Sequence, residues 1–248
     1  MGENGMLSIS EAADFLGISR QTLRRWDKAG TLRPSYISPG KHRYYRQSEL
    51  RKFASDLFSR ANNWALASSE AIPAADDAYC PTSSVFQARL ATLETALQKI
   101  PDLQKEYRFS LVVAVVAEIG DNAFAHNLGQ WPDIPGVFFA YDTNRRQVVV
   151  ADRGVGILAT LRQVRPSLPD HREALRVAFT ERLSGRSPEN RGGGLKFVRK
   201  IISQNNFSLF VQSGDARLRL SGGDPALRIS SADTPLRGTL ALIEFSPS

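Results

Sequence analysis

Glu118, Asn122 and His126 recur every four residues, and their side-chain types suit phosphate chemistry. They follow an apolar run from Leu111 to Ala117, so we expect one helix to place all three on one face. A carboxylate such as that of Glu118 can orient or deprotonate an attacking water molecule. The amide oxygen of Asn122 can bind Mg²⁺. The same spacing also occurs on solvated helix faces, so these residues alone do not separate a site from an ordinary surface.

A second motif follows a predicted strand. Residues 147–151 are rich in β-branched side chains, and they lead into Asp-x-Gly-x-Gly at Asp152, Gly154 and Gly156. The two glycines let the backbone pass close to a ligand, because they lack a Cβ atom. An ordinary hairpin turn is the alternative interpretation, since Asp-Arg-Gly is common in turns.

A third motif consists of three consecutive glycines, residues 192–194, which precede Leu195 at the start of a predicted helix. Backbone N–H groups at the start of a helix bind anions. The polar loop before the glycines contains Arg182, Arg186 and Arg191, which could neutralise phosphate oxygens. A flexible hinge without a ligand is the alternative interpretation.

The order and spacing of the three motifs resemble the GHKL ATPases, which share the Bergerat fold. The resemblance spans residues 85–248 and includes Gly238-Thr239 before the last predicted strand. It implies that the chain binds ATP with Mg²⁺, with Glu118 as catalytic base and Asn122 as metal ligand. It also implies that Asp152 accepts a hydrogen bond from the adenine amine, with support from Thr239. The nucleotide contacts it implies are Asn122, Asp152, Gly154, Gly156, Gly192, Gly193, Gly194, Leu195 and Thr239.

Residues 1–53 carry most of the positive charge, with ten Lys or Arg against five acidic residues, which gives +5 of the net +7. Such a charge favours a polyanionic partner. Two short helices are predicted here, with Ser10 and Ser19 as N-caps and Gly17 between them. Two short helices joined by a turn of this kind form a helix-turn-helix. A hairpin with its turn at Pro39-Gly40 follows.

This region resembles the winged-helix head of MerR and excisionase-type regulators from residue 7 to residue 53. The resemblance is carried by Ser-x-x-Thr-Leu-Arg-Arg-Trp at 19–26 and Pro-Gly-x-His-Arg-Tyr-Tyr at 39–45. It implies double-stranded DNA as a partner, with the second helix in the major groove and the hairpin wing on phosphates. A basic protein-docking module without DNA binding is the alternative. The DNA contacts we expect are Arg20, Thr22, Arg24, Arg25, Lys41, His42, Arg43 and Tyr44.

We therefore predict an α+β chain with two domains. Residues 1–66 form the winged helix-turn-helix and the helix after it, which in MerR-like proteins often pairs with its twin, so we expect a homodimer. Residues 67–84 form a linker rich in Ala, Ser, Asp and Pro. Residues 85–248 form a Bergerat-fold α/β sandwich, a mixed sheet with helices on one face. The strands expected in its last part are 207–212, 217–220, 226–229 and 239–245.

The sequence favours a protein without membrane association. No apolar run approaches the roughly 20 residues that span a bilayer, and the N-terminus lacks the pattern of a signal peptide. Cys80 is the single cysteine, so the sequence holds neither a disulfide framework nor a thiol metal cluster. We therefore expect a cytoplasmic location.

Together these features predict a DNA-binding regulator whose nucleotide site binds Mg-ATP and hydrolyses it slowly. Two alternatives use the same site: a serine protein kinase of the anti-sigma type, acting on an unidentified protein partner, and an ATP sensor without turnover. In anti-sigma-type kinases a His stands at the position of His126. Glu118 favours turnover over sensing, because magnesium binding alone needs only Asn122.

Overall fold

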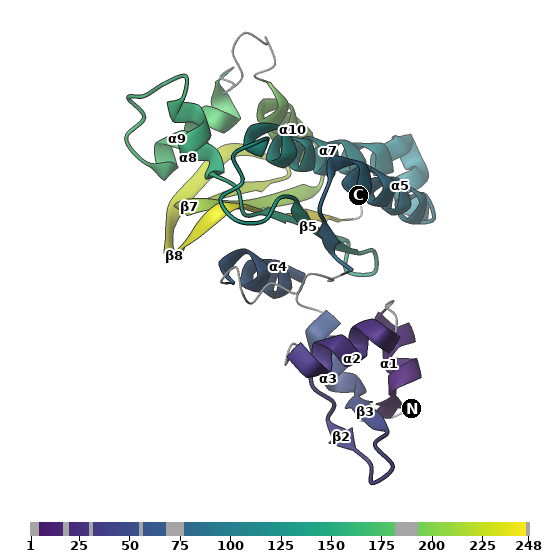
Figure 1. The fold of residues 1–248 in the computed structure, drawn as a ribbon. Helices are drawn as coiled ribbons and strands as arrows, with labels where there is room; N and C mark the ends of the chain where they lie inside the picture. The colour runs from purple at the N-terminus through teal and green to yellow at the C-terminus, as the bar shows by residue number, and fades with distance from the viewer. Residues whose placement is uncertain are drawn as a thin grey trace. The chain divides into compact units, whose positions relative to one another are not determined.

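The structure, a computed structural model, describes residues 5–16, 20–29, 32–54, 57–67, 77–181 and 193–246. The chain divides into two compact units (Figure 1). The first unit comprises residues 1–57 and 72–78. The second comprises residues 58–71 and 79–248, and we call it the pocket unit. Each unit is described by itself.

The first unit contains the predicted helix-turn-helix and hairpin. Its helices are α1 (Ile9–Leu16), α2 (Arg20–Ala29) and α3 (Gln47–Ala54). Its antiparallel sheet has the order β1-β3-β2, with β1 at Met6–Ser8, β2 at Tyr36–Ile37 and β3 at Arg43–Arg46. Strands β2 and β3 form the predicted hairpin. A small core of buried side chains holds helices and sheet together: Ala12, Ala13, Leu23, Tyr45 and Leu50.

Helix α1 begins one residue after Ser8, so the prediction of Ser10 as its N-cap was wrong. The backbone N–H of Ser8 donates to Glu11 Oε2 at 2.8 Å, and the N–H of Glu11 donates to Ser8 Oγ at 3.4 Å. This reciprocal pair is a capping box, which satisfies N–H groups at the start of the helix. The predictions of Gly17 between the two helices and of Ser19 as the second N-cap concern residues outside the described part of the chain.

The pocket unit contains a five-stranded sheet with the order β4-β5-β6-β8-β7. Every strand pairing described in it is antiparallel, so the prediction of a mixed sheet was wrong. Tight turns join β5 to β6 and β7 to β8 directly, and strands joined in this way must pair antiparallel. The strands are β4 (Tyr79–Cys80), β5 (Val137–Asp142), β6 (Gln147–Asp152), β7 (Phe207–Ser221) and β8 (Asp224–Phe245).

Three of these strands differ from the expected pattern. The four short strands predicted after residue 206 are two long ones, β7 and β8, which join at Gly222-Gly223. The ladder between them shifts register near Ser213, but the two strands stay paired on both sides of the shift. The sequence pattern predicted a break between separate strands there. Strand β4 lies inside the expected linker and pairs with β5.

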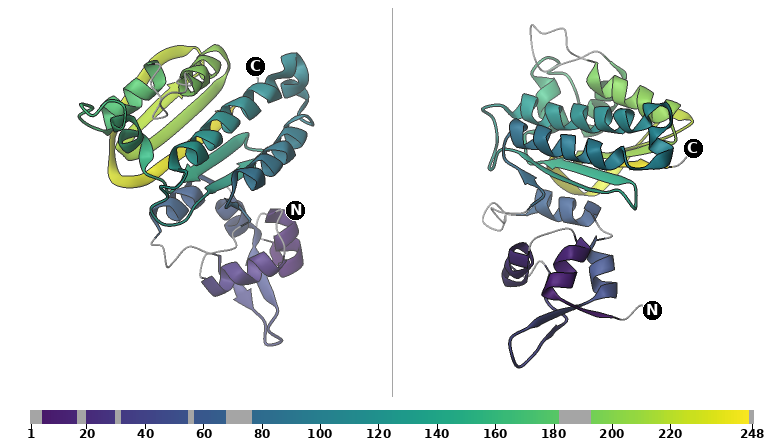
Figure 2. Two further views of the ribbon diagram at one scale, coloured as in Figure 1. Left: turned by 45° about the horizontal axis from the view of Figure 1, so that its top comes forward. Right: turned by 90° about the vertical axis from the view of Figure 1, so that its right-hand side faces the viewer.

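Three long helices cover one face of this sheet: α5 (Ser83–Leu97), α7 (Arg108–Asn127) and α10 (Gly194–Gln204) (Figure 2). In α5 the buried residues are Phe86, Leu90, Leu93 and Leu97, and their spacing of three or four is typical of an amphipathic helix. A short helix α6 (Pro101–Gln104) and a 3₁₀ turn, Lys105–Tyr107, connect α5 to α7. Helices α8 (Gly156–Arg162) and α9 (His171–Thr180) form a smaller cluster beside the sheet.

Helix α7 is the one described helix whose length and composition would allow it to cross a membrane. Core helices of soluble proteins pass the same test, and α7 packs between α5 and α10. Its buried residues include Val112, Val116 and Ile119, which belong to the main core with the inner residues of the sheet. The helix therefore serves as a rigid support for the polar residues near its end.

Helix α4 (Leu57–Leu66) covers the opposite face of the sheet, so the prediction of helices on one face was wrong. The ring of Phe58 meets Phe210 edge-on with centroids 5.2 Å apart, and Trp64 lies 6.0 Å from Phe138. Along each strand these two phenylalanines alternate with residues of the main core, so they point to the other face. The helix expected to belong to the N-terminal domain therefore packs in the pocket unit.

A buried arginine fastens the end of α4. Arg153 follows the last residue of β6 and is 3% exposed. Its guanidinium donates to the carbonyl oxygens of Trp64 at 2.7 Å and Ala65 at 3.2 Å, and it pairs with the carboxylate of Asp133. The last carbonyl groups of a helix have no partner within the helix, so Arg153 supplies donors that they need.

Candidate functional site

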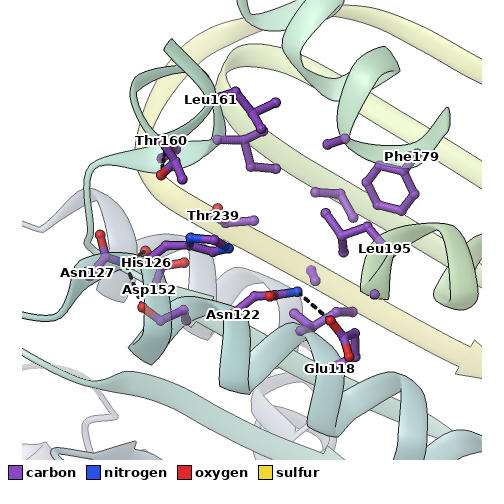
Figure 3. Close-up of a pocket in the computed structure, with 18 of the residues that line it drawn as sticks. Glu118, Asn122, His126, Asn127, Asp152, Thr160, Leu161, Phe179, Leu195 and Thr239 are labelled. Carbon is purple, nitrogen blue, oxygen red and sulfur yellow. Dashed lines mark hydrogen bonds between the residues drawn. The ribbon is translucent and has the colours of Figure 1, made fainter. Parts of the chain in front are cut away.

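A cavity lies among helices α7 to α10 and strands β6 to β8 of the pocket unit. Most of its polar side chains come from α7, β6 and β8, and mainly apolar side chains from α8, α9 and α10 face them (Figure 3). A lining that combines an apolar surface with a few polar groups suits a ligand such as a nucleotide, which has an apolar base and polar phosphates. The labelled polar groups are Glu118, Asn122, His126, Asn127, Asp152, Thr160 and Thr239.

Glu118, Asn122 and His126 all line the cavity from α7, as their spacing predicts. Asn122 Nδ2 donates to Glu118 Oε1 at 3.0 Å. A carboxylate only accepts, so the NH₂ end of the Asn122 amide must face Glu118. Its oxygen therefore points elsewhere and can serve as a cation ligand.

The two described glycines of the glycine run have different surroundings. Helix α10 begins at Gly194, where an added Cβ would stand 1.4 Å from Glu118 Oε1. At Gly193 an added Cβ would meet no atom of the described residues within 4 Å. A side chain at position 194 would therefore displace the carboxylate of Glu118, whereas one at position 193 would not. Gly192 and the predicted phosphate partners Arg182, Arg186 and Arg191 lie outside the described residues.

Asp152 forms the end of β6 and is 4% exposed. Its Oδ1 accepts from the N–H of Gly154 at 2.8 Å, and the backbone and hydroxyl of Thr239 also donate to it. Burial raises the pKa of Asp152 from 3.8 to about 6, although these hydrogen bonds oppose the rise. The structure thus brings together Asp152 and Thr239, which are 87 positions apart in the sequence.

The glycines after Asp152 also differ. Gly156 lines the cavity with a φ of +80°, a conformation that favours glycine. Gly154 does not line the cavity, and an added Cβ there would meet the side chain of Asn127 at 2.1 Å. Gly154 therefore makes room for Asn127, a residue that sequence reasoning missed. Asn127 breaks the four-residue spacing of its neighbours, so no periodic signal identifies it.

Among the described residues, no three His, Cys, Asp or Glu side chains gather as a metal site. A tightly enclosed metal centre is therefore absent from this part of the chain. Mg²⁺ needs less, because it usually binds one or two protein oxygens and completes its shell with water and phosphate. Asn122 and Glu118 provide such oxygens at the cavity wall.

A second hollow lies in the first unit, and we call it the basic notch. It is lined by Ser8, Ile9, Arg24, Lys41, His42, Arg43 and Tyr44. The structure therefore brings Arg24 of α2 next to the hairpin wing, where four more of the predicted DNA contacts lie. Lys41 stands at the hairpin turn with a φ of +60°, and its N–H donates to Ser38 O at 2.8 Å. This turn leaves Lys41 and His42 exposed.

Comparison with known families matches residues 6–56 to the family described as "Helix-turn-helix domain". Residues 6–56 are a helix-turn-helix domain. A relative is the type II methyltransferase M.Eco47II of Escherichia coli, with 40% identity over 57 residues. These residues are 23% of this chain and 14% of that protein, so the chain spans a small part of the methyltransferase. The helix-turn-helix domain suggests DNA as a partner, and the pocket unit lies outside the family match.

The predicted contact residues of the helix-turn-helix domain differ in their surroundings. Arg20 is exposed on α2 but does not line the basic notch. Arg43 is held by Asp27 of α2, with Nε and Oδ2 2.6 Å apart, so it joins the wing to the second helix. Tyr44 packs beside Tyr36, with ring centroids 6.1 Å apart. The side chains of Thr22 and Arg25 lie outside the described residues.

Proposed function

We propose that the chain is a DNA-binding regulator whose cavity binds Mg-ATP and hydrolyses it slowly. The observation that carries this proposal is Asp152, a buried carboxylate at the edge of a cavity with Glu118 and Asn122 on the same lining. The antiparallel sheet with α5, α7 and α10 on one face supports a Bergerat fold of the GHKL type. Helix α4 on the other face is an addition to that architecture.

In this proposal Asp152 accepts a hydrogen bond from the exocyclic amine of adenine. Guanine presents a carbonyl oxygen at the matching position, and two acceptors do not bond, so Asp152 selects adenine. The hydroxyl of Thr239 helps to orient Asp152. The apolar side chains of Ile157, Leu161 and Leu195 supply the surface on which a base and ribose are buried.

The phosphates then extend toward Glu118, Asn122 and Gly194. No Lys or Arg is among the described residues that line the cavity, so phosphate charge must be balanced in another way. Mg²⁺, when bound, would supply that charge, and the Asn122 oxygen would hold it. Arg182, Arg186 and Arg191, the predicted phosphate partners before Gly193 in the sequence, would add further positive charge. Glu118 is held by Asn122 and orients the water that attacks the terminal phosphate.

Phosphate release from Mg-ATP tests this proposal, with nucleotide binding measured on the same proteins. We expect slow release by the unaltered protein, and loss of release with retained binding in Glu118→Gln. Asn122→Ala should lose magnesium-dependent binding. Absence of nucleotide binding in the unaltered protein would contradict the proposal.

Two other outcomes separate the alternatives that share this cavity. Binding without turnover would favour an ATP sensor. Transfer of the labelled terminal phosphate to a protein, in place of water, would favour a protein kinase. Glu118 favours turnover over sensing. Binding of the base does not need a carboxylate beside Asn122, whereas hydrolysis needs a group that orients water.

The DNA arm of the proposal uses the basic notch. Arg24, Lys41 and His42 would contact phosphates of double-stranded DNA, while the exposed face of α2 enters the major groove. A homodimer would place two such domains on a two-fold site. DNA binding by gel shift, with a mixed-sequence competitor, tests this arm separately from nucleotide binding.

We further propose that α4 couples the two activities. It follows the helix-turn-helix domain in the sequence, and Arg153, the neighbour of Asp152, donates to its last carbonyl groups. A shift of the turn after β6 on nucleotide binding would therefore reach α4 directly. Equal DNA affinity with ATP, with ADP and without nucleotide would contradict the coupling.

A further inference from the structure

Asn127 is a buried amide, 3% exposed, and it makes contacts in three directions. Its Nδ2 donates to Ala123 O within α7 at 2.7 Å and lies 3.5 Å from Asp152 Oδ1. Its Oδ1 accepts from the N–H of Val155 at 2.8 Å. One side chain thus joins the end of α7 to the strand end and the turn that carry Asp152.

These contacts use both kinds of hydrogen-bonding group of the amide. A carboxylate could not donate to Ala123 O or Asp152, and an aliphatic side chain could satisfy none of the three partners. Glutamine would need one more methylene group in a space that Gly154 already limits, since an added Cβ there would meet Asn127 at 2.1 Å. Asn127 and Gly154 therefore fit each other.

We propose that Asn127 is a positioning residue for adenine recognition: it fixes the carboxylate of Asp152 as a hydrogen-bond acceptor and joins it to the helix that carries Glu118 and Asn122. This inference rests on the proposed function, in which Asp152 accepts a hydrogen bond from the exocyclic amine of adenine. Asn127 acts through Asp152. It sets the separation between the base-binding end and the phosphate end of the cavity.

Among the described residues, few charged groups face Asp152. Helix α7 contributes His126 and, farther along the cavity, Glu118. The described lining residues of α8, α9, α10, β7 and β8 carry no charge. Arg153 is the next residue, but its guanidinium binds Asp133 and α4. A new charge at position 127 would therefore act on Asp152 with little competition.

The test compares Asn127→Asp with Asn205→Asp. Asn205 follows α10 and donates to Ile201 O at 2.8 Å, four residues back, as Asn127 does to Ala123 in α7. It does not line the cavity. Both variants lose the same kind of helix-end hydrogen bond and gain a carboxyl group, but only one of them places that group beside Asp152.

The first measurement follows the ¹³C signal of the Asp152 carboxyl against pH, without nucleotide. We expect Asn127→Asp to raise the titration midpoint by about one pH unit or more, because a like charge beside a carboxylate favours its protonated form. Asn205→Asp should leave the midpoint unchanged. An unchanged midpoint in Asn127→Asp would overturn the inference, whatever the protein binds.

The second measurement compares Mg-ATP with the triphosphate of purine riboside, which lacks the adenine amine. The unaltered protein should prefer ATP by about tenfold, and Asn127→Asp should reduce this preference to about twofold or less. Equal weakening of both ligands would mean a structural role only and would overturn the inference. Asn127→Ser, which adds no charge, should reduce the preference in the same direction if Asn127→Asp does not fold.

Failure of the proposed function gives a different result. The carboxyl midpoint would still respond to Asn127→Asp, but the unaltered protein would bind neither triphosphate. That outcome overturns the assignment of adenine and leaves Asn127 as a partner of Asp152 alone. Loss of the midpoint response with normal ATP binding would overturn the role of Asn127 and leave the proposed function intact.

Discussion

The helix-turn-helix domain and the pocket unit place their functional groups in opposite ways. In the first, the proposed phosphate contacts Arg24, Lys41 and His42 are exposed and lie close together in the sequence. In the second, they come from positions as far apart as Glu118 and Thr239, and Asp152 is buried. Surface groups can change with little effect on the fold. Buried polar groups are part of the fold, so their substitution affects stability and function together.

Among the variants that test this difference between buried and exposed groups, Arg153→Met should show the largest effect, a loss of stability. Arg153 and Asp133 are 3% and 6% exposed as side chains, and removing one member of a buried ion pair costs about 3 kcal/mol or more. The carbonyl groups of Trp64 and Ala65 also lose their donor. We expect a correspondingly lower free energy of unfolding for the pocket unit in urea, followed by tryptophan fluorescence.

Arg237→Met is the matched control for this variant. Arg237 contacts the same Asp133 carboxylate at 3.3 Å, but its side chain is 54% exposed. Its removal should cost less than about 1 kcal/mol, because exposed ion pairs contribute little. Equal losses in the two variants would contradict the view that burial decides the effect.

Asp152→Asn should weaken Mg-ATP binding by about 100-fold, since a hydrogen bond to a charged group contributes about 1.5–3 kcal/mol. Isothermal titration at pH 7.5 would measure the change. DNA affinity without nucleotide should stay the same, because the helix-turn-helix domain does not contain the residue. Unchanged ATP binding would remove the proposed adenine contact.

The same variant should stabilise the protein in the absence of nucleotide. Folding raises the pKa of Asp152 to about 6, so the folded state binds more protons than the unfolded state between about pH 4 and 6. The free energy of unfolding therefore falls as pH rises through this window, by as much as roughly 3 kcal/mol. Asp152→Asn is neutral throughout. Its advantage should be largest near pH 8 and vanish near pH 4, as thermal melts over this range would show.

Gly194→Ala and Gly193→Ala sharpen the comparison within the pocket unit. A methyl group at 194 displaces the carboxylate of Glu118, whereas one at 193 stays clear of Glu118 and of every other described residue. We expect Gly194→Ala to lower ATP turnover by about tenfold to 100-fold through misplacement of Glu118. Gly193→Ala should stay near the unaltered rate. Similar turnover in both variants would mean that Glu118 does not act from its observed position.

Arg24→Ala should show the smallest effect, and it concerns DNA alone. Removing one phosphate contact should weaken DNA binding by about threefold to tenfold, and should reduce the slope of log affinity against log salt by about one. Arg172→Ala is the control, because Arg172 is exposed in the pocket unit, 59% as a side chain. Equal effects of the two variants would assign DNA binding to net charge and not to the basic notch.

The sequence predicted elements whose periodicity is local. Helix α5 has buried residues at spacings of three or four, β5 is rich in aromatic residues and β6 in β-branched residues, so their own residues specify them. The cavity group of Glu118, Asn122 and His126 was predictable for the same reason. Asp152 and Thr239 came from resemblance, because no local pattern relates two residues so far apart.

Features that depend on a partner element were predicted incorrectly. The direction of strand pairing is set between strands, so the antiparallel order of β6, β8 and β7 was not visible in any one of them. Strand β4 has two residues and no period. Helix α4 has an apolar side that suits several partners, and only the phenylalanines on the back of the sheet determine which partner it has.

The position of α4 bears on how such a protein can be assembled from parts during evolution. The matched helix-turn-helix domain ends at residue 56, and α4 begins at Leu57. A genetic exchange at this point would transfer the helix-turn-helix domain and leave the pocket unit with both faces of its sheet covered. An exchange ten residues later would remove α4 and expose Phe138 and Phe210 to water. A portable head of about fifty residues is therefore a better unit of exchange than the longer domain with its following helix.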